Sequence, residues 1–175
     1  MKRITQASLI ALTLLATACT RPDRFGGGDA GAGAGAGAGV NGGAAITDPA
    51  NDPNSPQFFS QRVGDRVLFA VDQSTLSPAA MATLDGQAAW LTANSDYLAI
   101  IEGHADEQGT REYNLALGAR RANAVREYLI SKGISDARLR TISYGKERPI
   151  EVCSDETCYS KNRRAVTIIS AGALS

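Results

Sequence analysis

Apolar and polar residues follow patterns along the C-terminal two thirds of the chain that predict four strands. Residues 66–71 alternate, with Val67, Phe69 and Val71 on one side, as in a half-buried strand. Residues 97–102, 139–144 and 166–169 read as three further strands. The runs 97–102 and 166–169 are almost continuously apolar, which is typical of strands buried on both faces.

Between these strands, apolar residues recur at steps of three and four, which predicts two helices. Ser77 and Pro78 suit the cap and first turn of a helix that ends near Ala93. A second helix spans about Arg111 to Ser131, and Gly133 ends it. The order strand, helix, strand, helix, strand, loop, strand predicts an α+β fold, a mixed sheet with helices packed on it.

The N-terminus has the pattern of a secretory signal over residues 1–18. Lys2 and Arg3 precede a short apolar run, and small residues follow at 16–18. The run is shorter than the roughly 20 residues that cross a bilayer. Ala16-Thr17-Ala18-Cys19 fits a bacterial lipobox, although the usual Leu three residues before the Cys is replaced by Ala16. We expect lipidation at Cys19; the alternative is a plain signal peptide with a stray Cys.

Residues 19–57 contain little that a fold could bury. Glycines fill 26–28, Ala and Gly alternate over 30–39, and prolines follow. This composition predicts a flexible linker with a coil reach of ~35 Å and an extended reach of ~130 Å. A silk-like Gly-Ala sheet is the alternative, but one short run offers no strands to stack on. Residues 58–175 are then the right length for one compact domain.

Charge excludes one class of function. Lys plus Arg equals Asp plus Glu, 18 each, so the formal net charge is zero. A bulk nucleic-acid binder needs a basic excess to neutralise phosphates, so we expect no nucleic-acid partner.

The densest polar cluster lies between the second strand and the second helix, over residues 102–110. Asp106 stands there between Gly103 and Gly109. The helix that follows places Asn114, Leu117 and Arg121 on one stripe at steps of three and four. An Asp can accept an ammonium group and an Arg can grip a carboxylate with two hydrogen bonds. Together they suit a ligand with a free amino-acid end.

These residues also carry a resemblance to a known family. The run from Gly103 to Ala122, Gly-His-Ala-Asp-Glu-x-Gly-Thr-x-x-Tyr-Asn-x-x-Leu-Gly-x-Arg-Arg-Ala, resembles the signature of the OmpA-like peptidoglycan-binding domain. Residues 143–149 and 160–166 resemble the later motifs of that family. The match spans about Val67 to Ile169.

The resemblance implies non-covalent binding of the meso-diaminopimelate of the peptidoglycan peptide stem, with no cofactor and no catalysis. It assigns the grip on the free end to Asp106 and Arg121. It also places the first-strand motif at the pocket, and here the chain departs from the family. Phe-Asp-x-Asp is usual, whereas this chain has Phe69-Ala70-Val71-Asp72. The remaining candidate site residues are Gly103, Asn114 and Leu117.

The lipobox and linker add to this resemblance, since the whole chain resembles the lipoprotein members of the family. That implies a lipid anchor in the outer membrane, facing the periplasm. It implies TolB of the Tol system as a partner, with TolA as a second candidate, and a role in envelope integrity and division.

Simpler interpretations stay open for several residues. Arg121 could be a solvated helix residue, and Asp106 could only form a turn. Asn114 could brace the loop, and Arg163 and Arg164 could position the site or stay on the surface. His104, the single His, is interpreted as structural and hydrogen-bonded within the loop.

Cys153 and Cys158 are expected to form a local disulfide, because an exported protein meets an oxidising compartment. A redox-active pair is the alternative, although the Cys-x-x-Cys spacing is absent. No metal site is expected, since the ligands that zinc needs are not evident.

Two other functions compete with a binding module. A wall hydrolase would use Asp106 or Glu107 as acid and His104 as base. A cell-wall anchor of another envelope machine, such as a flagellar motor, would usually carry a transmembrane helix.

Overall fold

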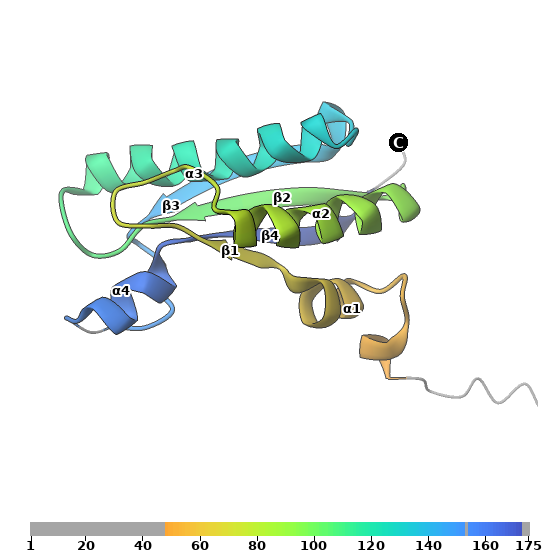
Figure 1. Ribbon diagram of the computed structural model, residues 1–175, viewed down its shortest axis with the longest axis horizontal. Helices are drawn as coiled ribbons and strands as arrows, with labels where there is room; N and C mark the ends of the chain where they lie inside the picture. The colour runs from red at the N-terminus through yellow and green to blue at the C-terminus, as the bar shows by residue number, and fades with distance from the viewer. Residues whose placement is uncertain (1–47, 153, 173–175) are drawn as a thin grey trace, which may run out of the picture. The chain divides into compact units, whose positions relative to one another are not determined.

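The computed structural model describes residues 48–152 and 154–172. Their core is a four-stranded sheet in the order β1-β4-β2-β3 (Figure 1). The strands are β1 (Arg66–Leu68), β2 (Tyr97–His104), β3 (Leu139–Gly145) and β4 (Arg164–Ala171). β2 and β3 are parallel, and β4 runs antiparallel to β1 and β2. The mixed α+β sheet predicted from the sequence is confirmed.

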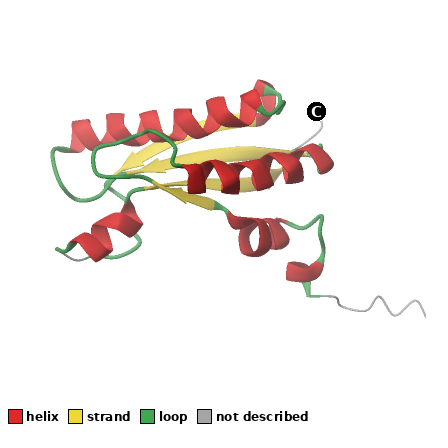
Figure 2. Cartoon of the chain, viewed as in Figure 1, coloured by secondary structure: helices red, strands yellow, loops and turns green. Residues whose placement is uncertain are grey.

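Helices α2 (Pro78–Ala93) and α3 (Arg111–Ser131) pack on one face of this sheet (Figure 2). Their bounds agree with the sequence prediction. The Ser77 hydroxyl accepts a hydrogen bond from the Ala80 amide, and the Thr110 hydroxyl accepts one from Tyr113. Each cap satisfies an amide that the first turn leaves without a helical partner. Among the described residues, no helix is long and apolar enough to cross a membrane.

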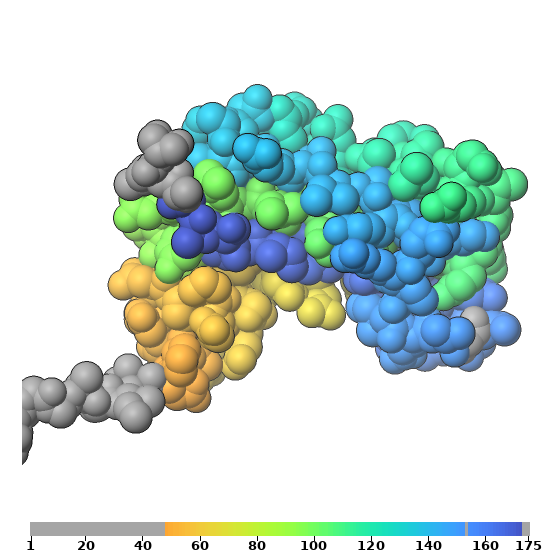
Figure 3. Space-filling model, turned by 180° about the vertical axis from the view of Figure 1, so that it is seen from behind, coloured from red at the N-terminus to blue at the C-terminus, as the bar shows by residue number. Residues whose placement is uncertain are grey.

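The opposite face of the sheet is open, and Figure 3 shows β4 uncovered from behind. Burial therefore alternates along β2, where Ala99 and Ile101 are buried and Ile100 is partly exposed. Ile168 in β4 is 41% exposed. The expectation that these two strands are buried on both faces is wrong, because α2 and α3 cover the same face.

The first strand is shorter than predicted and ends at Leu68 instead of Val71. Its partner β4 begins at Arg164, and the last contact between them is the Phe69 amide to the Arg163 carbonyl, 2.9 Å. The chain then turns, with Asp72 at a φ of 56°. Val71 is consequently on the surface rather than in the core.

The structure also contains short elements that the sequence patterns did not predict. They are η1 (Pro49–Asn51), α1 (Pro56–Phe58), the π-helical turn η2 (Phe59–Gly64), η3 (Asp136–Arg138) and α4 (Glu156–Asn162). Each is too short to show a helical period. Side chains of Asp48, Ser55 and Asp155 cap η1, α1 and α4 respectively.

The first of these elements move the boundary of the folded domain. The Trp90 indole N–H donates to the Pro53 carbonyl at 2.7 Å, and the Phe59 ring packs against Trp90. Residues 48–57, assigned to the linker from composition, are thus part of the fold. Prolines in this segment lie at the first positions of helical turns. Composition alone does not distinguish such prolines from those of a linker. The predicted signal peptide, Cys19 and the rest of the linker lie outside the described residues.

Close packing of α3 over β2 depends on two glycines. A Cβ added to Gly103 would lie 1.9 Å from the Gly118 carbonyl oxygen, and one added to Gly118 would lie 2.5 Å from the Ser143 hydroxyl. Helix α3 therefore runs directly against the backbone of β2. This contact fixes the start of α3 next to the loop that leaves β2.

Candidate functional site

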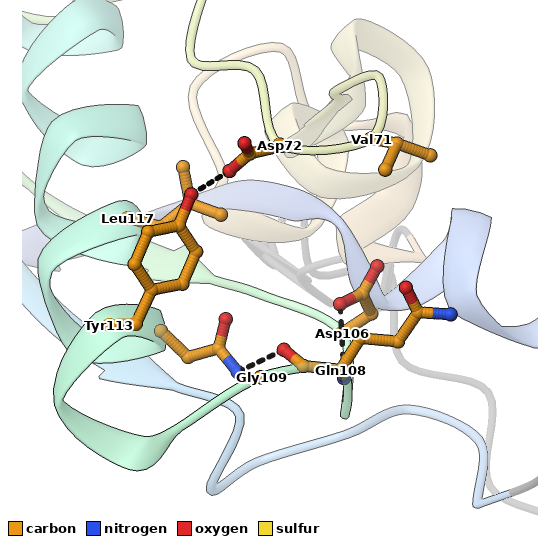
Figure 4. A pocket seen from close by; sticks show the side chains of 8 residues that line it. Val71, Asp72, Asp106, Gln108, Gly109, Tyr113 and Leu117 are labelled. Atoms are coloured by element: carbon orange, nitrogen blue, oxygen red, sulfur yellow. Dashed lines mark hydrogen bonds between the residues drawn. The ribbon is translucent and has the colours of Figure 1, made fainter.

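A pocket of about 290 Å³ opens between the turn after β1, the loop from β2 to α3, and the first turns of α3 (Figure 4). Eight residues line it: Val71, Asp72, Asp106, Gln108, Gly109, Tyr113, Asn114 and Leu117. Two of the eight carry a carboxylate, and none of the eight carries a cationic group. The lining alone therefore favours a ligand with a positive group.

Asp106 lies deep in this pocket and is almost completely buried. One carboxylate oxygen accepts the Gln108 amide at 3.3 Å, and the other accepts Nη1 of Arg163 at 3.1 Å. The Arg163 side chain is only 5% exposed. Both contacts hold the carboxylate in one orientation, as a binding group requires.

Three further residues of the predicted site, Asn114, Leu117 and Asp72, also line the pocket. The Asn114 amide donates to the Gln108 carbonyl at 2.7 Å, so it braces the loop as well. The Asp72 carboxylate accepts the hydroxyl of Tyr113, a contact that joins the turn after β1 to α3 across the pocket (Figure 4).

Arg121 does not line the pocket, although the sequence places it on the same helix stripe. Its side chain is fully buried and donates to three carbonyl oxygens: Gln73 at 2.8 Å, His104 at 2.8 Å and Ala70 at 3.1 Å. Burial lowers the pKa of Arg121 to about 10, while nearby Asp106 opposes that shift. Arg121 thus joins the two backbone segments that form the pocket.

Phe69 and Gly103 lie behind the pocket as well. The Phe69 ring packs 5.2 Å from the Arg121 guanidinium carbon. Gly103 faces Gly118, where only a residue without a side chain fits. Both are supporting residues in this structure and not part of the lining.

Sequence reasoning missed four lining residues, Val71, Gln108, Gly109 and Tyr113. Tyr113 could have been found, because it lies four residues before Leu117 and so shares a helix face with it. Val71 was assigned to the core side of a strand and was therefore not considered as a lining residue. Arg163 was considered a positioning residue, and its contact with Asp106 supports that interpretation.

His104 is buried at the end of β2, facing away from α3, with its ring stacked on Tyr144. Neither ring nitrogen has a hydrogen-bond partner among the described residues, so the expected hydrogen bond within the loop is wrong. Burial, with repulsion from Arg164 and Arg148, lowers the pKa of His104 to about 4. His104 is therefore a neutral packing residue near pH 7.

Cys158 is buried in α4 and is disulfide-bonded. Cys153, its predicted partner, lies outside the described residues. No group of three or more His, Cys, Asp or Glu side chains in the described ranges could hold a metal ion.

Comparison with known proteins adds to this geometry. The OmpA family model matches residues 68–163, more than half of the chain. The peptidoglycan-associated lipoprotein of Mesorhizobium japonicum is 54% identical over 131 residues, 75% of each chain. That of Pseudomonas aeruginosa is 40% identical over 159 residues, covering 90% of this chain and 92% of the relative.

Solved structures agree with the sequence matches. The crystal structure of the peptidoglycan-associated lipoprotein from Burkholderia pseudomallei has a TM-score of 0.62 and 39% identity, over 70% of this chain and 100% of that one. The C-terminal domain of Helicobacter pylori MotB has a TM-score of 0.58 at 22% identity, covers 62% of this chain and 86% of that one, and shows the fold alone. The chain belongs to the OmpA family, and within it to the peptidoglycan-associated lipoproteins.

Proposed function

We propose that this protein binds peptidoglycan without covalent chemistry, and that the pocket around Asp106 takes the free end of meso-diaminopimelate in the peptide stem. The observation that carries the proposal is the buried Asp106 carboxylate, held in place and facing a pocket lined by a second acid. The names of the relatives support the same ligand class.

The ammonium group of the ligand would lie between Asp106 and Asp72, which both line the pocket. Arg121, which lies behind the pocket lining, would interact with the ligand carboxylate. Its guanidinium has five N–H groups, and three of them donate to carbonyls. Because the side chain is enclosed, a direct grip requires the turn at residues 70–73 to open. Tyr113 would then release Asp72, so that the ligand ammonium group replaces the Tyr113 hydroxyl as the partner of the Asp72 carboxylate.

Binding, not turnover, is the proposed outcome. The module would join two layers of the envelope, with the lipid on Cys19 in the outer membrane and the pocket on the cell wall. From the family resemblance we include TolB as a protein partner, with TolA as a second candidate.

Co-sedimentation with purified sacculi of the diaminopimelate type tests this function. We would use the mature chain with Cys19→Ser, so that it stays soluble, and compare Asp106→Asn and Asp72→Asn. Asp136→Asn, which removes an exposed acid beyond the far end of α3, is the matched control. We expect the parent and the control to sediment and Asp106→Asn to remain in solution. Equal sedimentation of all four proteins would refute the assignment of the pocket, and release of soluble muropeptides would indicate a hydrolase instead.

A further inference from the structure

Helix α4 reaches the pocket through a chain of charges. Arg163, directly after α4, donates to Asp106 on one side and to both carboxylate oxygens of Glu156 on the other. Glu156 is exposed and lies in the first turn of α4, outside the pocket lining. Figure 1 shows α4 at the same end of the sheet as the loop between β2 and α3.

The charges around the pocket matter because of their sum. Arg121 interacts with Asp106, Arg163 and Asp72, and these two acids and two arginines sum to zero, so they would attract an ammonium group weakly. With Glu156 the five side chains carry one net negative charge. Glu156 stabilises the charged form of Arg163, raising its pKa, while Arg163 lowers the pKa of Glu156. Glu156 therefore takes up part of the positive charge that would otherwise cancel Asp106.

Helix α4 is also attached to the pocket loop by a second contact. The Asn162 amide donates to Glu107, next to Asp106, at 2.7 Å, and its oxygen accepts the Ile150 amide at 2.8 Å. The helix has only seven residues, too few to be stable alone. Cys158, which is buried in this helix, is disulfide-bonded.

We propose that Glu156, held in place by disulfide-bonded α4, determines the preference of the pocket for a ligand ammonium group. This rests on the proposed function and extends it to a residue that does not touch the ligand. The disulfide acts on binding only through the position of Glu156 and Arg163.

Isothermal titration with two soluble probes tests the proposal. One is a stem peptide that ends in meso-diaminopimelate with a free amine, and the other is the same peptide acetylated on that amine. We expect Glu156→Gln to weaken binding of the free-amine peptide about two- to fivefold, the range for an exposed charge. Binding of the acetylated peptide should not change, and the difference should shrink as salt rises.

The disulfide gives an independent arm of the experiment. Dithiothreitol supplies two electrons and two protons to the S–S bond, which yields two thiols, while the reagent becomes its cyclic disulfide. We expect the reduced parent protein to lose affinity for the free-amine peptide, and the Glu156→Gln protein to lose little more. Lys161→Gln is the control and should bind like the parent. Lys161 lies on α4 like Glu156, and the change removes its exposed ion pair with Glu151, which precedes the helix.

The outcomes separate the two proposals. If the parent binds neither peptide, the proposed function is wrong and this inference falls with it. If the parent binds but Glu156→Gln has the same affinity, only the role of Glu156 is wrong. A loss that is equal for both peptides would assign Glu156 a structural role and also overturn the inference.

Discussion

Arg121 connects the fold and the pocket through one side chain. It is fully buried and holds three carbonyl groups from the turn after β1 and the end of β2. Removing it would take a donor from each of these carbonyls, of which Ala70 keeps the Gln73 amide as a second donor, and each buried group left unpaired costs about 1–3 kcal/mol. Its effect on binding is thus inseparable from its effect on stability.

We expect Arg121→Ala to lower the free energy of unfolding by on the order of 3 kcal/mol or more. Urea denaturation followed by circular dichroism measures this. Arg120→Gln is the matched control, since Arg120 is exposed and lies over the Tyr113 ring, and it should change stability by about 0.5 kcal/mol or less. A folded Arg121→Ala protein of parental stability would show that the three hydrogen bonds do not support the fold.

His104 predicts a dependence of stability on pH. Its folded pKa is about 4, below the ordinary value of 6.5, so the unfolded chain binds the proton more readily. Above pH 6.5 His104 is neutral in both states and does not oppose folding. As pH falls from 6.5 toward 4, the unfolded chain takes up the proton first, and the free energy of unfolding decreases. The loss at low pH approaches about 3 kcal/mol.

Replacing His104 by Leu should remove that part of the pH dependence. We would compare the urea midpoints of both proteins at pH 7 and pH 4.5. The carboxylates are the same in both proteins, so the difference between the two pH dependences reports on His104. A parent and variant that lose the same stability between these two values would contradict the burial of a neutral His104.

At this scale the sequence predicted much of the pocket but not its depth. Asp106, Asn114 and Leu117 were found because they follow a loop and a helical spacing. The same spacing cannot distinguish a side chain that lines the pocket from one that lies behind the lining. For this reason Arg121 was predicted to line the pocket. That distinction depends on where the turn after β1 lies. The turn reaches Arg121 through the Gln73 carbonyl, which is 48 residues away along the chain.

Among the elements, the contact of α3 with β2 has the least tolerance. We expect Gly103→Ala to cost about 1–3 kcal/mol or more, because its Cβ would overlap the Gly118 carbonyl. It should also weaken ligand binding, since α3 and the loop before it would shift. Gly86→Ala is the matched control: its nearest neighbour would be Val63 at an ordinary 3.5 Å, and Ala favours the helix. Thermal unfolding of both proteins measures the difference, and equal melting temperatures would refute the packing argument.

Long periodic elements were predictable, and short capped ones were not. The bounds of α2 and α3 followed from apolar spacing and caps. Helix α4 has seven residues and owes its place to Asp155, Asn162 and the Cys158 disulfide, which are contacts rather than patterns. The burial of the strands was overestimated, because an apolar run does not reveal that both helices lie on one face.

For the whole molecule, the described chain begins at the end of the sheet opposite to α4 and the loop that carries Asp106 (Figure 1). Lipid anchoring was predicted at the N-terminus, so the linker would join the domain at the end away from the pocket. The order of signal, linker and domain stays a prediction from the sequence, whereas the distance between the start of the domain and its pocket required the fold.

The linker predicts a test of tethering that is independent of affinity. Deleting residues 20–47 should leave binding of a soluble stem peptide unchanged, since none of the residues that line the pocket lies in this segment. Lipid vesicles carrying the shortened lipoprotein should co-sediment less with sacculi, because ~90 Å of extended reach is lost. Vesicles with a Gly-Ser segment of equal length serve as the control. Unchanged co-sedimentation of the shortened protein would show that the linker is not needed for bridging.

The strand β1 connects the folded segment at Asp48–Gly64 with the turn that carries Asp72. If the protein joins two envelope layers as proposed, a force that pulls these layers apart would enter at one end of β1 and leave near the other. The antiparallel hydrogen bonds between β1 and β4 are then loaded lengthwise, in shear, so that they must break together rather than one after another. We therefore expect the ligand to be released before the sheet opens, so that the domain stays folded and can bind the wall again.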